Sequence, residues 1–296
     1  MLAVVTAALV ARHFAQTGWP LHSANLWLVA VAALIFVCAY AAKAWGWQRL
    51  FSDAERPAVL TLAAAGGAAS VGGIALPGRC DEVIRVAVVR RCRKRTASYG
   101  AVALSLVLLG LIDSAAMTPL AAVALAAVNF GGWMQAGLAV IIAAGFAAAA
   151  LVLALPRIAR FGFVERFRVG RWLRVHSTPR RETLWAWAAV ALSWLLRSLA
   201  IFVLLAALGL GTHYALAVAF VCASAASAVL PVAPAGAAVQ AGAGAAILVA
   251  AGVRTEEAVA FGLAAQALVI VAGAIFVLAL GAWHAQARFA PKLAAR

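Results

Sequence analysis

The chain has 296 residues, of which 67% are hydrophobic and only 11% are charged, and its mean hydropathy is +1.02. Soluble globular domains contain roughly 45 to 50% apolar and about 25% charged residues, so this composition excludes a soluble fold. At about 20 residues for each membrane-spanning helix, the chain has room for roughly seven to ten membrane segments. We therefore expect an all-α polytopic membrane protein, a single integral membrane domain over residues 1–296 with about six to eight transmembrane helices.

The net charge of +15 would point to nucleic acid in a soluble protein, but here the basic residues lie in blocks beside apolar segments. The blocks are Arg85–Arg95, Arg157–Arg181 and Arg288–Arg296. Such blocks are typical of cytoplasmic loops, and they attract anionic lipid head groups. The pattern predicts no nucleic-acid partner, a cytoplasmic C-terminus and contact with anionic lipids. The heavy use of alanine and arginine suggests a high-GC bacterium, and we expect the protein to lie in a bacterial inner membrane.

In chain order, a first short segment ends near Trp19 and Pro20, and we expect it to be a short membrane helix. Eight longer apolar runs follow: Leu26 to Ala42, Ala58 to Leu76, Ala97 to Val128, Gly137 to Leu155, Leu184 to Leu210, Tyr214 to Leu230, Ala235 to Val253 and Ala258 to Trp283.

The basic flanks of these runs predict which runs fail to cross the membrane. Nearly all Lys and Arg lie inside if four stretches face the cytoplasm, namely 43–56, 79–95, 157–181 and 288–296. The run 58–76 then has cytoplasmic flanks on both sides, which predicts a re-entrant hairpin from the inside. The same reasoning makes region 214–253 a hairpin that enters from the outside.

Helix, broken hairpin and helix in each half, with opposite orientation, make an inverted-topology repeat. Its halves span about residues 22–128 and 184–285, with a cytoplasmic basic loop at 157–182. The alternative is that all runs are ordinary full crossings, and hydropathy alone does not separate the two. Under either topology, the adjacent Gly66 and Gly67 allow close helix packing.

Each hairpin contains a run of small residues that ends in Leu-Pro. The first is AAAGGAASVGGIALPGRCDEVIR (63–85) and the second is VCASAASAVLPVAPAGAAVQAGAG (221–244). Broken helices in both halves are a pointer to a substrate site, because they leave polar groups facing a cavity at the middle of the membrane.

The densest polar cluster follows the first break and contains Arg79, Asp81, Glu82 and Arg85. Asp81 and Glu82 suit the first turn of a helix, and Arg85 lies one turn later, so the three can pair on one face. One hypothesis is a head-group site in which Arg79 and Arg85 hold a phosphate while the acids contact an amine or position the arginines. The other is a capped, self-neutralised helix start at the interface.

Asp113 and Arg197 lie within otherwise apolar spans, where a charge costs at least about 2.5 to 3.5 kcal/mol. Both lie roughly 20 Å deep when counted from the cytoplasmic ends of their helices at about 1.5 Å per residue. We therefore predict that they form an ion pair. The alternative is that each finds backbone, water or lipid on its own.

Other polar residues predict neither catalysis nor a cofactor. The five histidines are scattered near the ends of apolar runs, and the four cysteines show no metal-binding or disulfide spacing. No nucleotide-binding loop is present. We expect neither a metal nor any other cofactor, and no enzymatic activity.

Two segments resemble a known family. AGGAASVGGIALPGRCDEVIR, preceded by AWGWQRLF, and the downstream LPVAPAGAAVQAGAGAAILVAAGVRTEEAVAFGL are similar to the membrane region of lysylphosphatidylglycerol synthases and their stand-alone flippase-like relatives. The resemblance covers about Leu26 to Trp283 and implies an integral lipid-handling module without the aminoacyltransferase domain of some members. Pro234 and Gln240 of the second motif join the candidate substrate-binding residues, although this motif has Pro234-Ala235-Gly236 where Pro-Gly-Gly is commoner.

These observations favour a transporter that binds an anionic or amphiphilic lipid between two inverted halves and moves it between leaflets. The candidate lipids are phospholipids, polyprenyl-linked lipids and hopanoids. The main alternatives are a membrane-embedded lipid-modifying enzyme, with Asp81, Glu82 or Asp113 as acid or base, and a scaffold for a partner enzyme of lipid or cell-envelope synthesis. No nucleophile or base in a firm constellation supports the enzyme.

Overall fold

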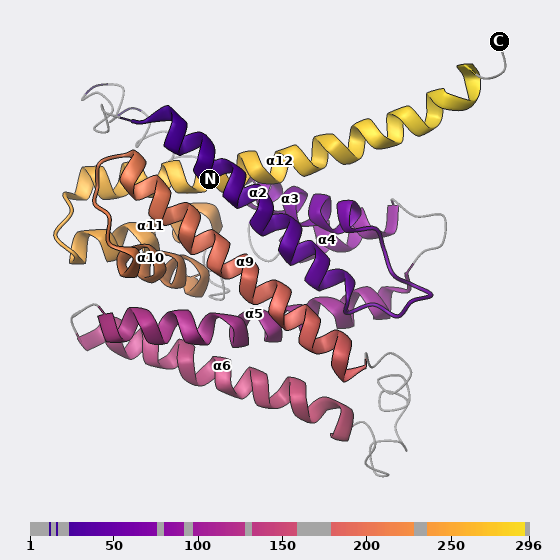
Figure 1. Ribbon diagram of the computed structural model, residues 1–296, viewed down its shortest axis with the longest axis horizontal. Helices are drawn as coiled ribbons and strands as arrows, with labels where there is room; N and C mark the ends of the chain where they lie inside the picture. Colours follow the sequence, from indigo (N-terminus) through magenta and orange to yellow (C-terminus); the bar gives the residue numbers. More distant parts are fainter. Residues whose placement is uncertain are drawn as a thin grey trace.

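The computed structural model describes residues 24–75, 80–91, 97–127, 132–158, 179–227 and 236–293, together with Arg12 and Gln16. Within these ranges every regular element is an α-helix (Figure 1). The helices are α2 (Leu26–Gln48), α3 (Val59–Ala75), α4 (Cys80–Arg91), α5 (Tyr99–Ala127), α6 (Gly132–Ile158), α9 (Arg180–Ala207), α10 (Tyr214–Ser227), α11 (Gly236–Ala250) and α12 (Thr255–Leu293). The predicted all-α fold is confirmed.

Five of the described helices, α2, α5, α6, α9 and α12, are long and apolar enough to cross a membrane. Helices α3, α10 and α11 are apolar but have 17, 14 and 15 residues, fewer than the roughly 20 that a full crossing needs. Short apolar helices of this kind suit the two expected hairpins. The further expected span, in the N-terminal segment, lies outside the described residues except for Arg12 and Gln16.

Helices α2 and α12 continue six and ten residues past the apolar runs that predicted them. Helix α2 extends to Gln48 although its apolar run ends at Ala42, and α12 extends to Leu293, ten residues past Trp283. The run ends at the first charge, Lys43, but lysine, glutamine and alanine are good helix formers and the backbone hydrogen bonds continue through them. Lys43 is therefore inside a membrane helix and not in a loop.

Helices α2 and α9 form an antiparallel pair in the middle of the fold. At one end the backbone N–H of Asn25 donates to the carbonyl of Ala207 at 2.9 Å, and at the other Arg49 pairs with Glu182 at 3.0 Å. The helices are close enough that a Cβ on Gly46 would lie 3.0 Å from the carbonyl oxygen of Ala186. Because α2 and α9 open the two predicted halves, their opposite directions are those of an inverted repeat.

The two short-helix pairs, α3 with α4 and α10 with α11, begin from opposite ends of the bundle. The segment leading into α3 is tied to the start of α5 by Glu55, which accepts from the N–H of Ser98 at 2.9 Å, and to the start of α9 by Arg56 and Glu182 at 3.8 Å. Helix α10 instead follows the end of α9, beside Asn25. Figure 1 shows α10 and α11 at the opposite end from the loop between α2 and α3. Both Leu-Pro breaks lie outside the described residues.

The same pairs of helices pack together in both halves. Helix α3 packs on α2 and α4, and α10 packs on α9 and α11. Each short-helix pair also contacts the last long helix of the other half, α3 with α12 and α10 with α5. Helix α6 lies outside this arrangement and packs on α5 (Figure 1). The arrangement agrees with the predicted inverted repeat, whereas the boundaries of its halves and the basic loop at 157–182 stay predictions.

Glycines permit the closest crossing between the halves. A Cβ on Gly273 of α12 would lie 2.9 Å from the Cα of Gly67 of α3, so the two backbones are in direct contact there. Gly66 instead faces the ring of Tyr40, which a Cβ would approach to 3.8 Å. The predicted small-residue packing is confirmed at Gly67, and it draws α12 against the first hairpin.

Candidate functional site

A cavity of about 390 Å³ lies where the helices of both halves meet. Residues from α2, α3, α4, α5, α9, α10, α11 and α12 line it, and described residues of α6 do not. Six of its lining residues are charged: Lys43, Asp81, Glu82, Arg85, Asp113 and Arg197. Ionisable side chains inside a membrane bundle are rare and mark substrate or ion pathways, so this cavity is the candidate functional site.

The cavity brings together most of the residues that the sequence singled out, from positions far apart in the chain. Those lining it are Asp81, Glu82, Arg85, Asp113, Arg197 and Gln240. Arg79 and Pro234 lie outside the described residues. Three basic and three acidic side chains thus face one space, which suits a polar head group better than an acyl chain.

Arg85 forms the local pair that its spacing predicted. Its Nη2 lies 3.3 Å from Oδ2 of Asp81, one helical turn away. Asp81 and Glu82 lie in the first turn of α4, as expected for acidic residues near the positive end of a helix dipole. Because both residues of this pair also line the cavity, the local capping role and a role in the cavity are compatible.

The predicted ion pair between Asp113 and Arg197 is wrong. Asp113 Oδ2 binds Nζ of Lys43 at 2.6 Å, and its Oδ1 accepts from Trp194 Nε1 at 3.0 Å. Similar depth was a necessary condition for the predicted pair, but it does not fix which face of a helix a side chain occupies. On α9 it is Trp194, one turn before Arg197, that reaches Asp113.

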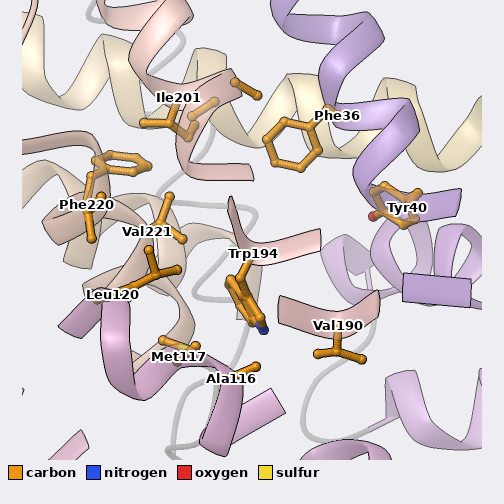
Figure 2. Packing of buried hydrophobic residues seen from close by; sticks show 14 of the residues in the cluster. Phe36, Tyr40, Ala116, Met117, Leu120, Val190, Trp194, Ile201, Phe220 and Val221 are labelled. Carbon is orange, nitrogen blue, oxygen red and sulfur yellow. The ribbon is translucent and has the colours of Figure 1, made fainter. Parts of the chain in front are cut away.

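Arg197 is held by aromatic rings. Its Cζ lies 5.0 Å from the ring centroid of Trp194, 5.5 Å from that of Tyr40 and 5.9 Å from that of Phe36. Figure 2 shows Phe36 and Tyr40 on α2 and Trp194 on α9. Rings at these distances stabilise a cation through their negative faces. Among the described residues Arg197 has no ion pair, and its Nε is buried without a hydrogen-bond partner.

Aromatic and hydroxyl groups complete the surroundings of these charges. Trp194 lies beside both Arg197 and Lys43, because its ring centroid is also 5.6 Å from Nζ of Lys43. The hydroxyls of Tyr40 and Ser70 are hydrogen-bonded at 2.6 Å, which joins α2 to α3. On α10, the hydroxyl of Ser224 is buried and has no hydrogen-bond partner in the structure.

Sequence reasoning missed Lys43, Trp194 and Ser224 as members of the site. Lys43 ended an apolar run and was assigned to a cytoplasmic flank, although the tryptophans at 45 and 47 indicate that the membrane helix continues beyond it. Trp194 and Arg197 are three residues apart, so helical periodicity places them on one face. Ser224 lies in the second small-residue run, 221–244, but no pattern there distinguishes it from Ser227 as a cavity residue.

The family model for the lysylphosphatidylglycerol synthase TM region matches residues 1–281 of the chain. No curated protein and no solved structure matches it. The match covers both hairpins and every residue that lines the cavity. The chain therefore belongs to the lysylphosphatidylglycerol synthase TM region family and is a multi-pass membrane protein of lipid metabolism or transport.

Proposed function

We propose that this protein is a lipid transporter that moves an anionic or amphiphilic lipid between the two leaflets of a bacterial inner membrane, with its C-terminus in the cytoplasm. The observation that carries the proposal is the cavity of about 390 Å³, lined by three basic and three acidic side chains inside an apolar helix bundle. Placing charged side chains inside a membrane costs free energy, and such residues mark the pathways of polar substrates through membrane proteins.

The size of the cavity favours a head group as its occupant. Small-molecule pockets in proteins span about 300 to 1,000 Å³, so a volume near the lower limit accommodates a head group but not two acyl chains as well. Large apolar side chains such as Leu34, Leu278 and Phe146 are exposed on the outside of the bundle, where acyl chains would contact them. The head group would cross inside the protein while the chains remain in the bilayer.

The helix arrangement offers a route for alternating exposure. One short-helix pair begins from each end of the bundle, and each contributes residues to the cavity, Arg85 from α4 and Gln240 from α11 among them. Rocking of one half against the other around this site would open it to one leaflet and then to the other. The proposed activity is transport and requires no chemical change in the lipid.

The proposal is tested in phosphatidylcholine vesicles that contain a trace of phosphatidylglycerol with a fluorescent label on one acyl chain, which leaves the head group unmodified. Dithionite bleaches only outer-leaflet label in protein-free vesicles, and we expect it to bleach the inner-leaflet label as well when the protein is inserted. Mass spectrometry of the extracted lipid is expected to show an unchanged mass. Bleaching that stops at the outer-leaflet pool contradicts transport, and a changed mass indicates the enzyme instead.

A matched pair of glycine variants assigns the activity to the cavity. Gly110 lines the cavity and Gly281 does not, and a Cβ built on either glycine meets nothing within 4 Å. Gly110→Leu is expected to fill part of the cavity and slow the inner-leaflet bleaching, whereas Gly281→Leu is expected to leave the rate unchanged. Equal rates in the two variants would exclude this cavity as the route.

A further inference from the structure

The three basic side chains of the cavity differ in whether a carboxylate already binds them. Lys43 lies 2.6 Å from Asp113, and Arg85 lies 3.3 Å from Asp81. An anionic ligand at either of these cations has to compete with a carboxylate of the protein. Arg197 has no ion pair among the described residues, so an anion can bind there without displacing an acidic group.

The surroundings of Arg197 stabilise its charge without satisfying its N–H groups. The centroids of three rings, Trp194, Tyr40 and Phe36, lie within 6 Å of its Cζ, which is the range of cation–π attraction. No hydrogen bond uses Nε, which is buried. A buried N–H without a partner is costly, and it is satisfied when a ligand supplies an oxygen. The guanidinium of Arg197 is thus positioned by the rings, and its Nε–H is free to donate a hydrogen bond to a ligand.

A second unsatisfied donor lines the same cavity from a neighbouring helix of the same half. The Oγ of Ser224 on α10 is buried and has no hydrogen-bond partner in the described part of the chain, and a hydroxyl hydrogen rotates to face an available acceptor. Arg197 and Ser224 come from different helices. Donors that line one cavity from two helices suit the tetrahedral set of oxygens on a phosphate better than the two coplanar oxygens of a carboxylate.

We infer that Arg197 and Ser224 form a phosphate-binding site, and that the ligand class of this cavity is a phosphate ester. The planar guanidinium donates two parallel hydrogen bonds to phosphate oxygens, and the serine hydroxyl donates to a third oxygen. Under the proposed transport function, on which this inference rests, the phosphate is that of the lipid head group. Arg85 stays bound to Asp81 and has the smaller role.

Calorimetric titration of the full-length protein in detergent tests the ligand class. The probes are dioctanoylphosphatidylglycerol, dioctanoylglycerol, glycerol 1-phosphate and decanoate. We expect dioctanoylphosphatidylglycerol to bind at least about tenfold more tightly than dioctanoylglycerol or decanoate. Neither of these probes carries a phosphate, and losing hydrogen bonds to a charged group costs affinity on this scale. Tighter binding of glycerol 1-phosphate than of the lipid would support the site but assign it to a soluble ester. Equal binding of dioctanoylphosphatidylglycerol and dioctanoylglycerol overturns the inference.

Variants test the anchoring residues. Arg197→Gln is expected to weaken dioctanoylphosphatidylglycerol binding about tenfold or more, and Arg197→Lys by an intermediate factor, because lysine keeps the charge but lacks the fork. Arg254→Gln is the control, since that arginine is 72% exposed between α11 and α12. Binding that is as strong in Arg197→Gln as in this control overturns the inference. So does a larger loss in Arg85→Gln than in Arg197→Gln.

Ser224→Ala keeps the test independent of folding, because it removes a hydroxyl that has no hydrogen-bond partner among the residues that the structure describes. We expect an unchanged thermal midpoint and binding weaker by a factor of about three to ten, as for one hydrogen bond. Binding unchanged in Ser224→Ala removes this residue from the site. The binding and vesicle measurements distinguish failure of this inference from failure of the proposed function. Binding at Arg197 without leaflet exchange contradicts only the proposed function. Leaflet exchange that is unchanged in Arg197→Gln contradicts only this inference.

Discussion

Asp113 binds side chains from two other helices, Lys43 of α2 and Trp194 of α9. Lys43 and Asp113 are each 21% exposed. Asp113→Asn leaves Lys43 without its carboxylate partner and within electrostatic reach of Arg85 and Arg197. We expect the free energy of unfolding to fall by about 2 to 4 kcal/mol, slightly less than for a fully buried pair. Thermal unfolding of the purified protein in detergent measures it.

A double-mutant cycle identifies the true partner. Lys43→Met keeps the length of the side chain and removes its charge, so the double variant with Asp113→Asn is expected to recover part of the two separate losses. Arg197→Gln is expected to be close to additive with Asp113→Asn. A larger coupling energy between 113 and 197 than between 43 and 113 would contradict the observed pairing.

The indole N–H of Trp194 is a second residue-scale contribution to this network. Trp194→Phe retains a ring beside Arg197 but removes the 3.0 Å hydrogen bond to Asp113, at an expected cost of about 1.5 to 3 kcal/mol for a bond to a charged group. Trp187→Phe is the matched control, because Trp187 is on the same helix and is 42% exposed. Equal unfolding midpoints for the two variants would mean that this hydrogen bond contributes nothing.

At the scale of elements, the crossing of α3 and α12 depends on the absence of side chains. Gly273→Ala places a Cβ 2.9 Å from the Cα of Gly67, and backbone cannot move aside as a flexible side chain can. We expect a loss of about 1 to 3 kcal/mol in unfolding free energy, as for overpacking elsewhere. Gly281→Ala on the same helix meets nothing within 4 Å and is expected to be neutral or slightly stabilising. A midpoint for Gly273→Ala equal to that of Gly281→Ala would mean that the helices separate at no cost.

At the scale of the whole molecule, the ends from which the two short-helix pairs begin are open to a labelling test. In a background without the four native cysteines, Ser52→Cys reports the loop between α2 and α3, and Arg254→Cys the loop between α11 and α12; both positions are exposed. An impermeant maleimide is expected to label Arg254→Cys in intact cells and Ser52→Cys only in inside-out vesicles.

The possible labelling patterns have distinct meanings. Labelling of both cysteines from the same side would contradict the opposed arrangement of the hairpins. Labelling from opposite sides, but with inside and outside exchanged, would preserve the inverted repeat and reverse the predicted orientation of the C-terminus. The charge distribution favours the orientation with position 52 inside and position 254 outside, because the basic blocks at 85–95 and 288–296 then both face the cytoplasm.

Local features of this protein were predictable from its sequence alone. Each apolar run from Leu26 onward corresponds to a described helix, and most helix ends lie within a few residues of the end of the run. The reason is that every backbone N–H and C=O inside a membrane must be hydrogen-bonded within the protein, which an α-helix achieves by itself. The pair of Arg85 and Asp81 also followed from spacing, since residues four apart on a helix are neighbours wherever that helix lies. Basic flanks and paired Leu-Pro breaks further indicated two opposed hairpins.

Contacts between helices were decided only by the tertiary structure. Depth along a helix follows from counting residues, but the direction in which a side chain points depends on how each helix is rotated against its neighbours, and packing sets that rotation. For this reason Asp113 binds Lys43 and Trp194, while Arg197, at a similar depth, lies among aromatic rings with its Nε unpaired. Rotation likewise brings Ser224 of the neighbouring helix α10 to the same cavity.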